Sequence, residues 1–202
     1  MKATKITKED VIRAFILDKS EELFIQNGFE KTSMDMIAEA CDLSKPTIYS
    51  YFPCKNDLFM DIHVRLHVRI NDTILDHLKK DEDRLGVLAE IVDSAVRVVG
   101  EHRDFLRVFN REYHHLTHEN LSEHIDWTIT NRKAMSRVFT RFLDGIVQPE
   151  VKKRFDVESL ASMILSMFDM LFFDLAVNES DRTAVYKGLL FYILKNSVLK
   201  SG

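Results

Sequence analysis

The sequence predicts an all-α protein, and three observations carry this prediction. The 202 residues include only 6 glycines and 3 prolines, so the turns that join strands are scarce. Apolar residues recur at helical spacing along most of the chain. Capping residues stand where several of these periodic segments begin. The apolar content of 46% and the charged content of 30% are typical of a soluble globular chain with one or two domains.

The first helix is expected to begin after Thr7, because the sequence TKED resembles a capping box with Asp10 in place of the preferred Glu. Asn27 and Gly28 end this helix, and Gly28 suits a left-handed C-cap. The residues expected on its inner face follow helical spacing. They are Ile16, Leu17, Ser20, Leu23 and Phe24.

Two short helices follow, separated by the break CDLS at residues 41–44. Ser33 caps the first of them. Asp42 lies in the break and is one of the few residues other than glycine that tolerate a left-handed backbone. The second short helix runs from about Lys45 to Phe52. Two short helices joined by a tight turn are typical of a helix-turn-helix, so residues 1–55 are predicted to form a DNA-binding domain.

Pro46 is expected to mark the start of the second short helix, where its missing N–H costs no helical hydrogen bond. The cap is either Ser44 or, because proline disfavours helical angles in the residue before it, Lys45. Ile48 and Phe52 are four residues apart and are expected to point inward. Small polar, basic and aromatic side chains remain for the outer face, as a DNA-reading helix requires. They are Lys45, Thr47, Tyr49, Ser50 and Tyr51.

The stretch TSMDMIAEACDLSKPTIYSYFPCKNDLF, within a match from Ile16 to Phe59, resembles the DNA-binding signature of the tetracycline-repressor (TetR) family of bacterial regulators. The resemblance implies phosphate contacts from Thr32 or Ser33, and from Ser44, Lys45, Tyr49, Tyr51 and Lys55. It places Lys45, Thr47 and Ser50 near base edges. Three residues depart from the family pattern, which commonly has Gly, Gly and Ser at these positions. They are Asp42, Pro46 and Cys54.

Residues 56–202 are expected to be helical throughout, and the resemblance implies a ligand-sensing and dimerising domain. A long helix carries Leu58, Phe59, Ile62, Leu66, Ile70 and Ile74 on one face. Further helices are expected near residues 84–100, 103–117, 119–147, 157–177 and 181–199.

Aromatic and methionine side chains in these helices can line an adaptable apolar pocket or form ordinary core. Together with the resemblance, they lead us to expect that some line a pocket for a small apolar or amphipathic effector. The candidates are Phe105, Phe109, Tyr113, Trp127, Met135, Phe139, Met167 and Phe168.

The segment from Leu160 to Leu175 is apolar on more than one face, so it must be buried, and a second copy of the chain is a natural partner. The candidate interface residues are Leu160, Ile164, Leu171, Leu175, Val185, Leu189 and Tyr192. A two-fold dimer presents two reading helices to a palindromic operator. The expected function is a cytoplasmic, homodimeric DNA-binding regulator without a cofactor, and the resemblance implies that it is a repressor. The alternative is a DNA binder of the same fold without a small-molecule ligand, either architectural or controlled by another protein.

Enzymatic, metal-binding and membrane functions have less support from the sequence. No catalytic triad order or glycine-rich phosphate loop is found. His63 and His67, and the cluster His114, His115 and His118, leave a metal sensor as a minor alternative. Cys41 and Cys54 are expected to be reduced thiols. The sequence has no uninterrupted apolar run of about 18 residues, so no membrane span is predicted.

Overall fold

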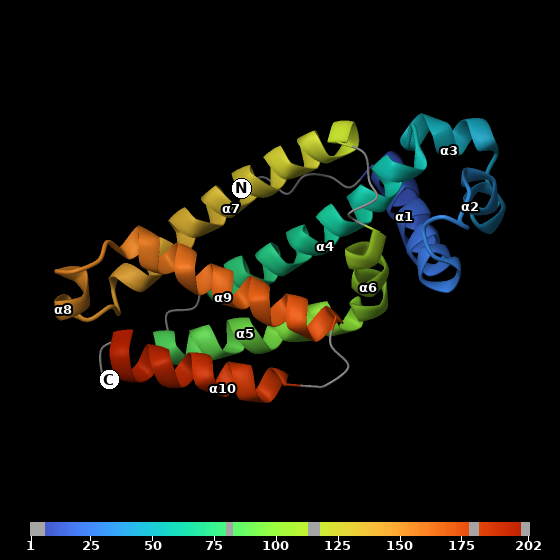
Figure 1. The fold of residues 1–202 in the computed structure, drawn as a ribbon. Helices are drawn as coiled ribbons and strands as arrows, with labels where there is room; N and C mark the ends of the chain where they lie inside the picture. Colours follow the sequence, from blue (N-terminus) through green and yellow to red (C-terminus); the bar gives the residue numbers. More distant parts are fainter. Residues whose placement is uncertain (1–6, 80–82, 113–117, 178–181, 199–202) are drawn as a thin grey trace. The chain divides into compact units, whose positions relative to one another are not determined.

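A computed structural model describes residues 7–79, 83–112, 118–177 and 182–198, which are helical and contain no strand (Figure 1), so the all-α prediction is confirmed. The elements are α1 (Lys8–Asn27), α2 (Met34–Ala40), α3 (Lys45–Tyr51), α4 (Lys55–His77), α5 (Arg84–Glu101), α6 (Arg103–Glu112), α7 (His118–Asp144), α8 (Pro149–Lys152), α9 (Val157–Val177), α10 (Thr183–Ile193) and the π-helical turn η2 (Leu194–Val198). The short helix α8 was not predicted. The last helix gives way to the π-helical turn at Leu194, where a continuous helix was expected.

The helices group into two compact units. The first contains α1, α2 and α3, the part of α4 up to Arg65, α6 from Asp104 and the part of α7 up to His124. The second contains the rest of α4 and of α7, together with α5, α8, α9 and α10. Helices α4 and α7 are each continuous in the chain and contribute residues to both units.

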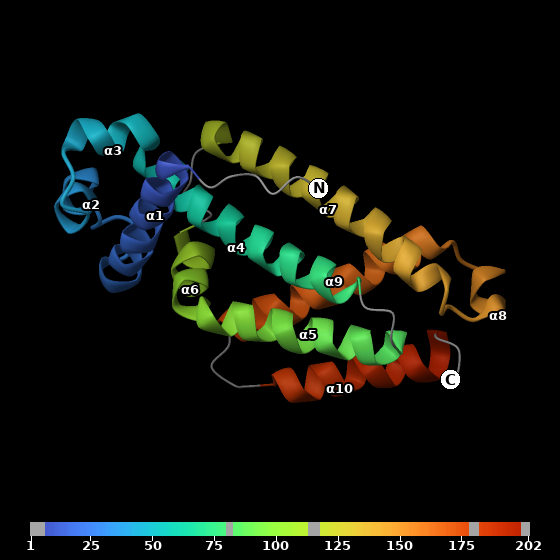
Figure 2. The same cartoon turned by 180° about the vertical axis from the view of Figure 1, so that it is seen from behind.

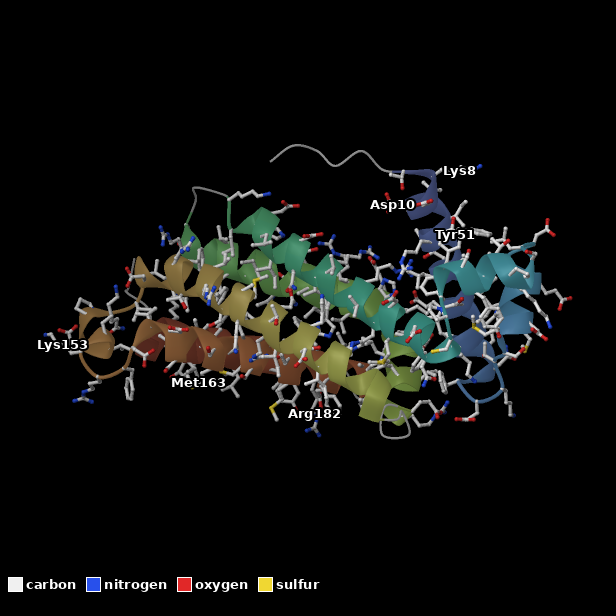
Figure 3. All side chains as sticks on the ribbon, turned by 90° about the horizontal axis from the view of Figure 1, so that it is seen from above. Lys8, Asp10, Tyr51, Lys153, Met163 and Arg182 are labelled. Carbon is white, nitrogen blue, oxygen red and sulfur yellow. The ribbon has the colours of Figure 1, made fainter. Side chains whose placement is uncertain are left out.

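The first helix starts at the predicted capping box, where Figure 3 labels Asp10. The Thr7 hydroxyl accepts a hydrogen bond from the Asp10 amide at 3.1 Å, and the Asp10 carboxylate accepts one from the Thr7 amide at 2.9 Å. These bonds hold the pKa of Asp10 below its usual value. Gly28 ends the helix with a positive φ of 79°, which favours glycine, but its ψ of 168° lies outside the left-handed helical conformation that was expected of this cap.

Phe59 is the centre of the core of the first unit. Its ring lies 4.9 Å from that of Phe24 and 4.7 Å from that of Phe29. The rings of Phe105 and Phe109, which α6 supplies, each lie 5.3 Å from it. Helix α6 therefore packs its aromatic face on the first turns of α4, and this core supports the short helices α2 and α3.

The second unit is built around α5, α9 and α10, which pack against one another and lie side by side in both views (Figures 1 and 2). Helix α9 has the bounds that the sequence predicted. By length and composition it could cross a membrane, but the core helix of a soluble protein passes the same test. Ile164 and Phe168 of α9 are buried, and Phe168 contacts Phe139 of α7 at a ring distance of 6.1 Å. These contacts place one side of α9 in the core of the second unit.

Candidate nucleic-acid interface and cavity

The turn between α2 and α3 follows the predicted pattern. Ser33 caps α2 and accepts a hydrogen bond from the Met36 amide at 3.2 Å. Asp42 has a φ of 53°, so it occupies the left-handed region as expected. The Leu43 amide then donates to the carbonyl of Ala38 at 3.0 Å, which closes the turn.

Ser44 is the N-cap of α3, and Pro46 lies in the first turn of this helix. The Ser44 hydroxyl accepts a hydrogen bond from the Thr47 amide at 3.3 Å and lies 2.8 Å from the Thr47 hydroxyl. Of the two caps that the sequence allowed, Ser44 is therefore correct. The exposed first turn of α3 presents backbone N–H groups, which favour an anion such as a phosphate.

Helix α3 is fixed on one side and open on the other. Ile48 at its centre and Phe52 at its C-cap are 0% and 1% exposed, as predicted. Lys45, Tyr49 and Ser50 are exposed, and Thr47 is half-buried. Tyr51 is half-buried and packs against the core of the first unit. The surface formed by Lys45, Thr47, Tyr49 and Ser50 is called the reading face below.

Two of the residues expected near phosphates have structural contacts instead. Thr32 is 1% exposed, and its hydroxyl donates to the carbonyl of Gly28 at 2.8 Å. The Lys55 ammonium donates to the carbonyls of Phe29 at 2.7 Å and of Thr32 at 2.9 Å, and lies 4.2 Å from the centre of the Phe29 ring. Ser33 is exposed at the start of α2, so it has the accessible side chain of the Thr32–Ser33 pair.

Arg13 of α1 holds the end of α3 in place, a role that the sequence did not indicate. Its guanidinium donates to the carbonyl of Tyr51 at 3.0 Å, pairs with the Asp61 carboxylate and lies 4.3 Å from the centre of the Phe52 ring. Burial raises the pKa of Asp61, and the Arg13 charge opposes that shift. This contact joins α1, α3 and α4, so it positions the reading face on the first unit.

Lys45 at the start of the reading face is paired with Asp35 of α2 at 2.5 Å, and both side chains are more than half exposed. An exposed pair of this kind contributes little to stability. The carboxylate nevertheless competes with any phosphate for the Lys45 ammonium.

Replacing Asp35 by asparagine is therefore expected to tighten DNA binding about threefold to tenfold at moderate salt, because it frees one cation and removes one anion. Fluorescence anisotropy with a labelled duplex measures the change. Glu39→Gln removes the same charge from α2 and serves as the control. An equal gain in both variants would mean that general charge, and not the release of Lys45, causes the effect.

The second unit contains a cavity of about 140 Å³. Its lining comes from α4, α7 and α9, and six of the twelve lining residues are apolar. The lining residues are His67, Ile70, Asn71, Ile74, Thr128, Asn131, Arg132, Met135, Leu165, Phe168, Asp169 and Phe172. A second hollow of about 190 Å³ shares Asn71, Asn131 and Met135 with it.

The charged groups at this cavity neutralise each other. Arg132 of α7 pairs with Asp169 of α9, and the same guanidinium donates to the Ser166 hydroxyl at 2.7 Å and to the carbonyl of Ser162 at 3.3 Å. Burial lowers the pKa of His67, and the nearby Asp169 charge opposes that shift. His67 is therefore neutral at pH 7, and the cavity has no net charge.

Met135 and Phe168 are the two predicted pocket residues that line the cavity. Phe105 and Phe109 lie in the core of the first unit. Phe139 is fully buried between aromatic neighbours, and Trp127 packs against His67 at a ring distance of 6.2 Å. Met167 is half-buried and is not among the lining residues.

Several residues named in the sequence analysis cannot be placed. Tyr113, His114 and His115 lie outside the described residues, as does the side chain of His118. Among the described residues, no group of three or more His, Cys, Asp or Glu side chains is arranged to hold a metal ion.

Polar residues on an otherwise apolar stripe were the signal in the sequence that could have identified the cavity. His67 and Asn71 fall on the same face of α4 as Ile70 and Ile74.

An apolar surface runs over α9 and α10 and is called the α9–α10 face. On α9, Met163, Met170 and Phe173 are 55%, 75% and 57% exposed, and Figure 3 labels Met163 there. The exposed residues that complete it are Val177, Val185, Leu189, Tyr192 and Ile193.

The residues predicted for the dimer interface divide between the two sides of these helices. Leu160, Ile164 and Leu171 are buried within their own chain, and Leu175 is half-buried. The first three therefore have little surface to offer a second copy. Val185, Leu189 and Tyr192 are 66%, 54% and 68% exposed and belong to the α9–α10 face.

Two family models match the chain. The model described as "Bacterial regulatory proteins, tetR family" matches residues 16–62, and the one described as "Tetracyclin repressor-like, C-terminal domain" matches residues 81–172. The first range includes the helix-turn-helix and the reading face, and the second includes α5, α6, α7, α8 and most of α9.

Known proteins similar to this chain are transcriptional regulators. An uncharacterized HTH-type transcriptional regulator of Bacillus subtilis, YvdT, is 24% identical over 190 residues, which are 91% of this chain and 93% of that protein. Among solved structures, the fatty acid degradation regulator FadR of Bacillus halodurans has a TM-score of 0.69 at 17% identity, over 96% of this chain and 98% of that one. A putative transcriptional regulator of Saccharomonospora viridis in complex with choline has a TM-score of 0.67 at 18% identity, over 94% and 98%.

Proposed function

Because this chain belongs to the TetR family of helix-turn-helix transcriptional regulators, we propose that it is a repressor that binds a palindromic operator as a homodimer and leaves it when a small molecule binds. The observation that carries the proposal is the reading face. Buried Ile48 and Phe52 hold α3 on the first unit, while Lys45 and Tyr49 remain exposed for DNA.

Contacts to DNA divide into two groups in this proposal. Ser33, Ser44, Lys45, Tyr49 and Tyr51 contact phosphates and fix the register of the protein on the duplex. Lys45, Thr47 and Ser50 reach base edges in the major groove and set the sequence preference. Lys55 supports the turn before α2 and acts on DNA binding through that turn.

The second copy covers the α9–α10 face. Helices α9 and α10 pack together, and exposed apolar side chains in such numbers are typical of a protein–protein interface. A two-fold axis brings the face against itself, so that both copies bury it and form a four-helix interface. The dimer then presents two copies of α3 to the two half-sites of the operator.

The cavity of the second unit is the proposed effector site. Helix α4 supplies Ile70 and Asn71 to the cavity, and its first turns supply Leu58 and Phe59 to the core beneath the reading face. A ligand that binds more tightly to one position of α4 than to another shifts α4 toward that position. This shift changes the geometry in which the dimer presents its two reading faces to DNA. By linkage, a ligand that prefers the non-binding geometry releases the DNA.

The DNA-binding part of the proposal is tested by selecting duplexes from a random pool and measuring variants on the selected site. Tyr49→Phe is expected to weaken binding to every sequence by a similar factor, about threefold to tenfold, because one phosphate contact is lost. Thr47→Ala and Ser50→Ala are expected to change the preferred bases more than the overall affinity. Selection of the same bases by both alanine variants and the parent protein would contradict the assignment of base contacts.

A further inference from the structure

The cavity of the second unit has a size that limits its occupant. Its volume is about 140 Å³. An apolar protein cavity of about 150 Å³ is large enough for benzene. The part of an effector that this cavity encloses therefore has the dimensions of one small ring or a short chain.

Two asparagines at the cavity can form hydrogen bonds with a bound ligand. Asn71 of α4 and Asn131 of α7 line both hollows of the second unit, and each is half-buried. In the described part of the chain, neither side-chain amide has a hydrogen-bond partner. Each offers two N–H donors and one carbonyl acceptor, so the pair matches a ligand group that both donates and accepts.

The two charged side chains that line the cavity form an ion pair with each other. Arg132 is paired with Asp169, and the same guanidinium has further acceptors in Ser166 and Ser162. An anionic ligand that pairs with Arg132 competes with the Asp169 carboxylate and only replaces one carboxylate by another. A cationic ligand that pairs with Asp169 competes with Arg132 in the same way. A ligand charge that enters the cavity without forming either pair loses hydration that no partner replaces.

We infer that the effector is an electrically neutral molecule, with a small apolar ring or chain in the cavity and an amide or hydroxyl group between Asn71 and Asn131. This inference rests on the proposed function, since it assigns a chemical class to the ligand of the proposed effector site.

Benzamide, benzoate and benzylammonium form a matched set of probes, because they share one ring and differ in charge. Isothermal titration calorimetry with the full chain at pH 7.5 measures their binding. Benzamide is expected to bind at least about tenfold more tightly than either ion, a difference of about 1.4 kcal/mol. Equal or tighter binding of an ion overturns the inference, and so does a failure of benzamide to bind.

Two variants of the ion pair test the reason for this preference. Asp169→Asn leaves Arg132 without its counter-charge and is expected to make benzoate the preferred probe. Arg132→Gln leaves Asp169 unpaired and is expected to make benzylammonium preferred. Both side chains of the pair are partly exposed, so the variants are expected to fold, which circular dichroism verifies. An unchanged order of the three probes in both variants would mean that the pair does not set the preference.

Asparagine variants test the polar contacts. Asn71→Leu and Asn131→Leu keep the size of the side chain and are each expected to weaken benzamide binding about tenfold, because the amide of the ligand loses its partner. Thr73→Val is the control, since Thr73 of α4 lines neither hollow and its hydroxyl donates to the carbonyl of Arg69 at 2.8 Å. Retained affinity in both leucine variants contradicts the proposed contacts.

The outcomes separate this inference from the proposed function. Benzamide that binds selectively but leaves operator affinity unchanged contradicts the proposed release of DNA and supports the ligand class. A charged probe that binds best and releases the DNA contradicts the ligand class and supports the regulatory function.

Discussion

Replacing Leu189 by arginine is expected to convert the proposed homodimer to a monomer and to lower operator affinity by a factor on the order of 10² or more. Leu189 is 54% exposed on the α9–α10 face and lies about one helical turn along α10 from both Val185 and Tyr192. A two-fold interface places each substitution twice, so two guanidinium groups would be buried against apolar surface without partners. Analytical ultracentrifugation measures the mass, and fluorescence anisotropy measures the affinity for the operator.

The same experiment distinguishes the loss of the interface from the loss of the fold. Leu189 is exposed within its own chain, so the variant monomer is expected to keep its helical circular dichroism spectrum. Thr130→Arg, an exposed position on α7, is the matched control and is expected to remain dimeric. A Leu189→Arg protein that stays dimeric and keeps its operator affinity would show that the interface lies elsewhere.

Replacing Lys55 by methionine is expected to lower the free energy of unfolding of the first unit by about 2–3 kcal/mol. The ammonium donates to the carbonyls of Phe29, Glu30 and Thr32, so its removal leaves the turn between α1 and α2 without its donor. Loosening this turn also disturbs the position of α2, so weaker DNA binding is expected. Urea unfolding followed by circular dichroism measures the stability.

Lys31→Met is the matched control for this prediction, because Lys31 is exposed in the same turn. Its effect on stability is expected to stay within about 0.5 kcal/mol, as for an ordinary surface substitution. If Lys55→Met were as stable as the control but bound DNA much more weakly, Lys55 would act as a phosphate contact and not as a support for the turn.

The sequence predicted the starts of the first helices because helix caps are local. Thr7, Ser33 and Ser44 each satisfy backbone N–H groups only a few residues away, so a short stretch of sequence is sufficient to identify them. The left-handed backbone at Asp42 follows from the tightness of the turn in the same way. Together these local signals are sufficient to locate the helix-turn-helix in the sequence.

Contacts between distant residues were not predictable. The local sequence suggests only that Lys55 is an exposed cation. The carbonyls that it binds lie more than 20 residues earlier in the chain, so the local pattern does not show them. The partners Arg132 and Asp169 lie on different helices, and nothing in the local pattern joins them. Phe105 and Phe109 looked like pocket residues, but the packing of α6 on Phe59 places them in a core.

The sequence by itself determined that the chain is helical, where the helix-turn-helix lies and that Ile48 of α3 is buried while Lys45, Tyr49 and Ser50 are exposed, because periodicity and capping are encoded within a few turns. It did not determine that Tyr51 packs against the core. Only the tertiary structure decided which side of α9 is buried. This helix is apolar on nearly every face, so Ile164 and Met163 are equivalent by composition, and only its packing with α5 and α10 buries one and exposes the other. The charge balance of the cavity was decided in the same way, by which side chains the packing of α7 and α9 brings together.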